Sequence, residues 1–114
     1  MNHFHIWCNL KAGQNDLQFC ESVREFLSYL HERELIEGFY ITRRKFVISP
    51  PLLGEFEITV EFADTAQMNR AFEVVSEGGE EIIAFHKPIT DAVRNVSTAL
   101  YRDFPETAKR KGGQ

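Results

Sequence analysis

Residues 55–62 read Glu-Phe-Glu-Ile-Thr-Val-Glu-Phe, a strict alternation of polar and apolar side chains. Successive side chains of a β-strand point to opposite faces of its sheet, so the alternation predicts a strand with two unlike faces. The apolar face would pack in the core, and the glutamates would line the other face. A strand buried on one side only is typical of an antiparallel sheet that helices cover on one face.

The flanking sequence predicts further strands and helices. Residues 3–10 alternate in the same way and predict a strand. Over residues 15–35, apolar side chains recur every three or four positions, which predicts an amphipathic helix with Leu17 and Cys20 on its buried stripe. The remaining expected elements are a strand over 39–48, a helix from the N-cap Asp64 to Gly78, and a strand over 95–103. Residues 80–93 fit either a short helix or a strand.

This order of elements favours an α+β, ferredoxin-like fold. A right-handed crossover through the first helix leaves a gap between the first two strands, and the third strand fills it. The last strand then lies on the other side of the first. The result is a four-stranded antiparallel sheet with two main helices on one face. A chain of 114 residues can bury one core, so we assign residues 1–105 to a single domain and 106–114 to a flexible charged tail.

The sheet face away from the helices is expected to be aromatic. Trp7, Tyr101 and rings from the second strand would lie there. Because a large exposed aromatic face is rarely left in water, we expect a second copy to pack against it sheet to sheet, forming a homodimer.

Over about residues 3–104, this order of elements resembles the dimeric α+β barrel superfamily, which has a ferredoxin-like fold. We expect the chain to represent an uncharacterised family within it. The superfamily includes stress-responsive barrel proteins, small monooxygenases without cofactor and muconolactone isomerase-like enzymes. The resemblance implies a homodimer with a pocket between sheet and helices or inside the barrel, and it implies no particular reaction.

Two histidines on the first strand raise the question of a metal site. His3 and His5 are two residues apart and share a face, which Glu61 of the neighbouring strand would also reach. Two imidazoles and a carboxylate suit zinc or iron. We expect these side chains to be solvated or to pair with one another instead of holding a metal, and we expect no cofactor.

The same face offers candidates for an organic site. His5 beside Glu57 is a candidate general base. The candidate pocket walls are Trp7, Asn9, Tyr40, Arg44 and Tyr101. The alternative, which we favour, is that these side chains form the dimer interface, since interfaces draw on the same residue types.

A third candidate catalytic residue is His86, in the segment of undecided structure. It could overhang a pocket between helix and sheet, or it could be an ordinary surface residue.

Composition excludes several functions. The net charge of −4 argues against nucleic-acid binding, and no glycine-rich phosphate loop is present. No apolar run reaches the roughly 20 residues that a membrane helix needs. Cys8 and Cys20 have no metal-binding spacing, and we expect both to be buried thiols in a cytoplasmic protein.

The sequence therefore predicts a small dimeric ligand-binding or structural protein. The alternative is a small cofactor-free or metal-assisted enzyme, monooxygenase- or isomerase-like, that acts on a small organic molecule. RNA binding is a weaker third possibility, because exposed rings on such sheets stack bases, but the acidic strand opposes it.

Overall fold

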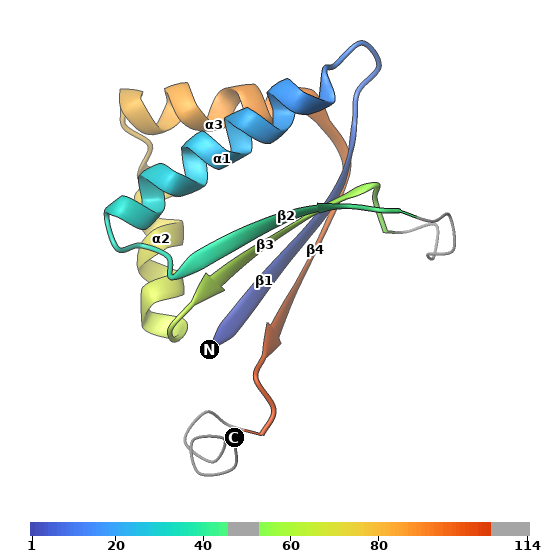
Figure 1. Cartoon of the computed structure of the whole chain (residues 1–114). Coiled ribbons are helices and arrows are strands. Elements are labelled where there is room, and N and C mark those ends of the chain that lie inside the picture. Colours follow the sequence, from blue (N-terminus) through green and yellow to red (C-terminus); the bar gives the residue numbers. More distant parts are fainter. Residues whose placement is uncertain (46–52, 106–114) are drawn as a thin grey trace.

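The alternating segments form the sheet that their pattern predicts. The computed structural model describes residues 1–45 and 53–105 (Figure 1). Its elements are β1 (Asn2–Leu10), α1 (Asp16–Glu32), β2 (Gly38–Arg43), β3 (Phe56–Phe62), α2 (Thr65–Glu77), α3 (Glu80–Ala92) and β4 (Val93–Arg102). The predicted strand over 39–48 begins at Gly38, and its residues 46–48 lie outside the described residues, as does the predicted tail.

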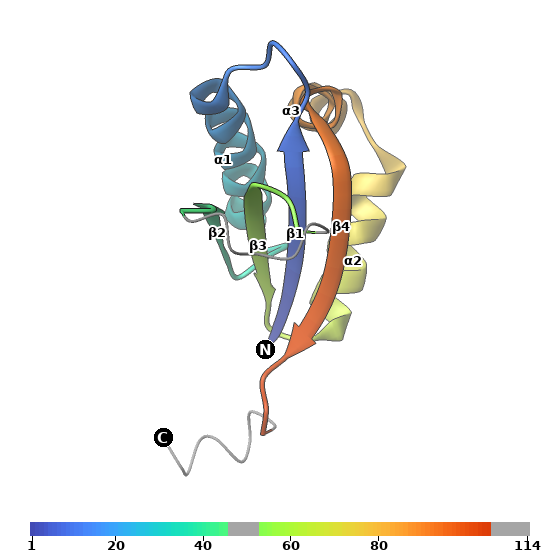
Figure 2. The ribbon, with the colours of Figure 1, turned by 90° about the vertical axis from the view of Figure 1, so that its right-hand side faces the viewer.

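The strands form one sheet in the order β2-β3-β1-β4, with antiparallel neighbours throughout. This confirms the predicted ferredoxin-like arrangement. All three helices lie on one face, and the other face is open (Figure 2). The register places His5 opposite Thr59 and Trp7 opposite Glu57, so the polar face of β3 and the odd-numbered residues of β1 share the open face.

Local signals set the ends of the helices. The side chain of Asn15 accepts a hydrogen bond from the Gln18 backbone N–H at 2.9 Å, and Asp64 caps α2 through the Gln67 N–H at 2.8 Å. Gly78 ends α2 in the left-handed region with φ of 53°.

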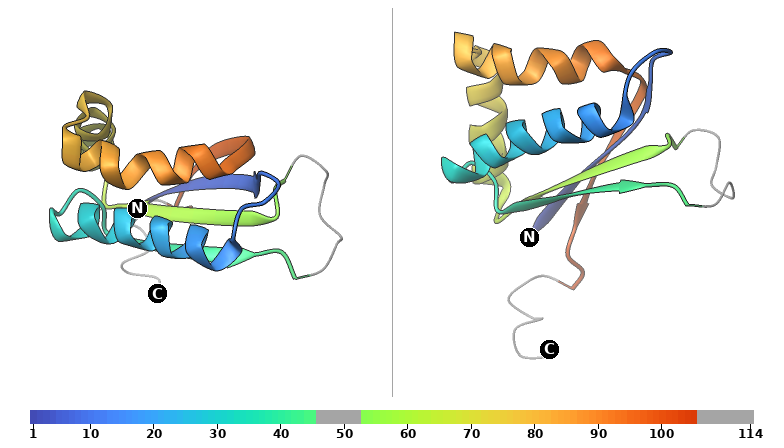
Figure 3. Two further views of the ribbon diagram at one scale, coloured as in Figure 1. Left: turned by 90° about the horizontal axis from the view of Figure 1, so that it is seen from above. Right: turned by 45° about the horizontal axis from the view of Figure 1, so that its top comes forward.

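Residues 80–93, which the sequence left open as helix or strand, contain the full helix α3. α3 has 13 residues, as many as α2, so the sheet carries three helices where two main ones were expected. α3 lies alongside α1 (Figure 3). β4 therefore begins at Val93, two residues earlier than predicted. Among the described residues, no helix has both the length and the apolar character that a membrane span requires.

The core lies between the sheet and the three helices, but the stripe of α1 differs from the prediction. Phe19, Val23 and Leu27 are buried, whereas Leu17 is 80% exposed. Cys8 is buried as expected, but Cys20 is only half-buried. The prediction was wrong at Leu17 and Cys20 because the Phe19 ring packs edge-on against Phe56 of β3, which turns its own side of the helix to the sheet.

Candidate functional site

Two adjoining cavities lie between the sheet and the helices. The larger has a volume of about 320 Å³ and is bounded by β1, β3, α1, α2 and α3. The smaller has a volume of about 240 Å³ and reaches β4. Four side chains line both cavities: Ile6, Phe26, Leu27 and His86. Among the described residues, no carboxylate, lysine or arginine lines either cavity, so both cavities are almost wholly apolar although they are partly open to solvent.

Of the four side chains that line both cavities, His86 of α3 is the one with a hydrogen-bonding group. Its ring packs against Phe26 with a centroid distance of 5.1 Å. Burial lowers the pKa of His86 below its ordinary 6.5, so the imidazole is neutral near pH 7. Within the described part of the chain, the structure gives this imidazole no hydrogen bond or ion pair. It can therefore donate or accept one hydrogen bond toward a bound molecule.

Cys8 of β1 lines the smaller cavity. Its side chain is 1% exposed, and burial raises the pKa of its thiol from 9.0 to about 11. Because the thiolate is the reactive form, Cys8 is an inert wall residue and not a nucleophile.

The cavities open along the edge of the helical layer. Phe72 of α2, which lines the larger cavity, is 44% exposed, and Val96 of β4, which lines the smaller, is 53% exposed. The exposed edge of each cavity therefore includes one apolar side chain, Phe72 for the larger and Val96 for the smaller.

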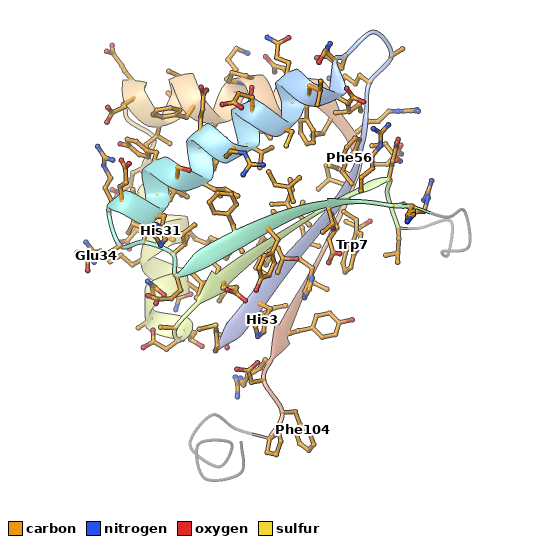
Figure 4. All side chains as sticks on the ribbon, viewed as in Figure 1. His3, Trp7, His31, Glu34, Phe56 and Phe104 are labelled. Carbon is orange, nitrogen blue, oxygen red and sulfur yellow. The ribbon has the colours of Figure 1, made fainter. Side chains whose placement is uncertain are left out.

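The predicted residues of β1 and β3 lie on the opposite side of the sheet. Figure 4 shows His3 and Trp7 on the side facing away from α1. His5 Nδ1 lies 2.5 Å from Glu57 Oε2. The His5 ring stacks on Trp7 at 5.6 Å and meets the Tyr101 ring edge-on at 4.9 Å. The structure thus brings together four of the residues proposed from sequence, as a flat aromatic surface around one imidazole–carboxylate pair.

The three candidate metal ligands do not converge. His3 Nε2 lies 2.7 Å from an oxygen of Asp103, and His3 Nδ1 lies 3.4 Å from Glu61. Glu61 also accepts a hydrogen bond from the Tyr40 hydroxyl at 2.8 Å, while His5 pairs with Glu57. Residues 1–45 and 53–105 hold no group of three or more histidine, cysteine or acidic side chains with metal-binding geometry.

The remaining pocket candidates lie at the far end of the open face. Asn9 accepts a hydrogen bond from the Glu55 backbone N–H at 2.9 Å, which joins β1 to the start of β3. Arg44, Trp7 and Glu57 line a polar hollow of about 150 Å³. Charged side chains line that hollow, which separates it from the two apolar cavities on the other side of the sheet.

Sequence reasoning placed His86 near a possible pocket but did not find the pocket's other walls. Phe4 and Ile6 of β1 and Phe26 of α1 were expected to be core residues, since their spacing is that of buried side chains. No pattern in the sequence distinguishes a filled core from one that encloses space.

The chain was compared with family models, curated proteins and solved structures. A family model described as "Family of unknown function (DUF6614)" matches residues 1–114. No curated protein matches the chain.

Three solved structures show the same fold. Protein At3g17210 from Arabidopsis thaliana has a TM-score of 0.74 at 8% identity, with 94% of this chain and 99% of that chain covered. SnoaB, a cofactor-independent oxygenase from Streptomyces nogalater, has a TM-score of 0.67 at 8% identity, covering 92% and 97%. A dabb family protein with a ferredoxin-like fold from Mesorhizobium loti has a TM-score of 0.63 at 19% identity, covering 90% and 96%. These likenesses confirm the predicted fold.

Proposed function

The chain belongs to DUF6614, a family of unknown function, and we propose that it binds a small apolar organic molecule between its sheet and helices, as a homodimer formed through the open sheet face. The observation that carries the proposal is the pair of apolar cavities that share a neutral imidazole, for which residues 1–45 and 53–105 supply no hydrogen-bond partner.

The size of the cavities supports a ligand. Sites for small molecules typically measure about 300 to 1,000 Å³ and combine apolar walls with a few polar groups. The larger cavity alone, at about 320 Å³, reaches this range. Native cores rarely leave so much space open, because each lining side chain loses packing contacts.

The test uses N-phenyl-1-naphthylamine, an apolar dye whose fluorescence rises in apolar surroundings. Val75 lines the larger cavity, and its neighbour Val74 does not, although both are half-buried on α2. We expect the wild type and Val74→Phe to bind the dye and Val75→Phe to bind it at least about tenfold more weakly, because the added ring fills the space. Equal dye binding by both variants, or none by the wild type, would contradict the proposal.

The pairing of charges on the open face supports a second copy as its cover. The imidazoles of His3 and His5 already contact carboxylates of their own chain. Burying this face would therefore leave few charges without partners. Trp7, Tyr40 and Tyr101 supply the rings that protein interfaces favour, and both tyrosines are more than half exposed.

Native mass spectrometry tests the dimer. We expect two chains for the wild type and one chain for Tyr101→Glu, which places a charge in the middle of the aromatic surface. Ile83→Glu is the matched control, because Ile83 is 52% exposed on α3, away from this face. A monomeric wild type would refute the proposed dimer.

A second candidate function is catalysis in the same cavity. A neutral imidazole in an apolar site is suited to take a proton as a general base, and SnoaB, which shares the fold, is a cofactor-independent oxygenase. The test is to identify any molecule retained by the purified protein and to incubate it with the wild type and with His86→Gln. Conversion by the wild type alone supports an enzyme, and its unchanged recovery from both supports a binding protein.

A further inference from the structure

The larger and smaller cavities, called lobes below, share four lining side chains, one of which is His86. Each is bounded by the same three apolar side chains at the junction and by its own walls farther out. A cavity of about 150 Å³ lined by aliphatic and aromatic side chains is large enough for benzene. At about 320 and 240 Å³, each lobe has room for at least one six-membered ring. A molecule that fills both must therefore have two apolar parts joined near His86.

The junction also sets the polarity of the ligand. Among the described residues, His86 is the one that lines both lobes with a hydrogen-bonding side chain; Ser76 lines the larger lobe and Thr98 the smaller, each at an exposed position. Thr90, in the smaller lobe, already donates its hydroxyl to the Lys87 carbonyl at 3.1 Å. A ligand that carries a permanent charge would lose its hydration and find no ionic partner among the described lining residues, which is costly. An uncharged hydroxyl can both donate to and accept from a neutral imidazole.

Building on the proposed function, we propose that the ligand is an uncharged molecule with two apolar lobes and a single hydroxyl between them, and that His86 recognises this hydroxyl. The apolar lobes supply most of the affinity, since burial of apolar area dominates such sites. The hydroxyl supplies orientation and selectivity, because a ligand without it leaves the imidazole unpartnered in the cavity.

Four probes with one skeleton separate these contributions. Diphenylmethane has two rings and no polar group, and benzhydrol adds a hydroxyl at the central carbon. Benzhydrylamine places a cation at the same carbon, and diphenylacetic acid attaches a carboxylate there. Binding is measured by displacement of N-phenyl-1-naphthylamine. We expect the wild type to bind benzhydrol about threefold to tenfold more tightly than diphenylmethane, the range of one net hydrogen bond. Both charged probes should bind more weakly than benzhydrol.

Variants assign the effect to the imidazole. His86→Phe keeps an apolar ring at the junction and should bind diphenylmethane while losing the preference for benzhydrol. His31→Phe is the matched control, since His31 is exposed on the last turn of α1 and should leave the preference unchanged. If His86→Phe does not fold, the order of the four probes on the wild type still decides the question.

The outcomes distinguish the two proposals. If the wild type does not bind the dye at all, the larger proposal of a ligand cavity fails together with this one; if the dye binds but no member of the series displaces it, only the present proposal fails. If diphenylmethane and benzhydrol bind equally to the wild type, the cavity stands and the role of His86 is refuted. Tightest binding of the amine or the acid would refute the uncharged ligand.

Discussion

The buried thiol of Cys8 gives a quantitative check on the cavity wall. The chain has two cysteines, so Cys20→Ser leaves Cys8 as its one thiol. Burial raises the pKa of Cys8 from 9.0 to about 11. At about pH 8, the thiolate fraction then falls from about one in ten to about one in a thousand. Because iodoacetamide reacts with the thiolate, we expect alkylation about 100-fold slower than in the unfolded chain, before any steric hindrance.

The assay is the rate of mass gain on alkylation, measured for Cys20→Ser in buffer and in denaturing urea. Cys8→Ser is the matched control, since the half-buried Cys20 that remains should react much faster in the folded protein. The reasoning would be refuted by a folded Cys20→Ser protein whose rate lies within about threefold of the unfolded rate, because Cys8 would then be neither desolvated nor enclosed.

Three further predictions concern stability, measured as the free energy of unfolding in urea. Folding lowers the pKa of His86, so its neutral form contributes stability that is present above pH 6.5 and lost as pH falls through the lowered pKa; we expect a smaller acid loss in His86→Phe than in the wild type, and equal losses would contradict this. Asp64→Ala removes the cap of α2 and should cost about 1 kcal/mol; an unchanged midpoint would show that the cap is dispensable. Gly54→Ala should be strongly destabilising because its Cβ would overlap the backbone of Cys8, whereas Gly79→Ala, with open space around it, should not; similar costs at both positions would count against the close packing.

The sheet could be predicted from sequence because two of its strands show a clear alternation of polar and apolar side chains. The alternation in residues 3–10 and 55–62 fixes which side chains share a face, and an antiparallel pairing then brings His5 toward Glu57. The capping side chain of Asp64 fixed the start of α2 in the same local way. The face of each strand and the cap of α2 depend on short-range geometry, which a single sequence carries, whereas the pairing of the strands followed from the order of the elements.

The family resemblance implied a pocket between sheet and helices, but the size and walls of the cavities could not be predicted, because these depend on how far apart the layers lie. α3 packs alongside α1, and exposed apolar side chains remain on the edge strand β4. Nothing in residues 80–93 reports that spacing. The exposure of Leu17 has a similar origin, since the competition between Leu17 and Phe19 for the core is decided by Phe56, far along the chain.

Strand β1 contributes side chains to both the cavities on one side of the sheet and the open face on the other. Its even-numbered side chains, Phe4, Ile6 and Cys8, face the helices and cavities, and its odd-numbered ones, His3, His5 and Trp7, face outward. A single exchange at an even position can therefore alter ligand preference during evolution while the outer surface stays intact, and the converse holds at odd positions. Inserting one residue into β1 would exchange the two faces for all residues on one side of the insertion, unless a bulge absorbs the extra residue. Duplicated genes for this chain could thus diverge in either property separately by point substitution, but an insertion or deletion in β1 would alter both.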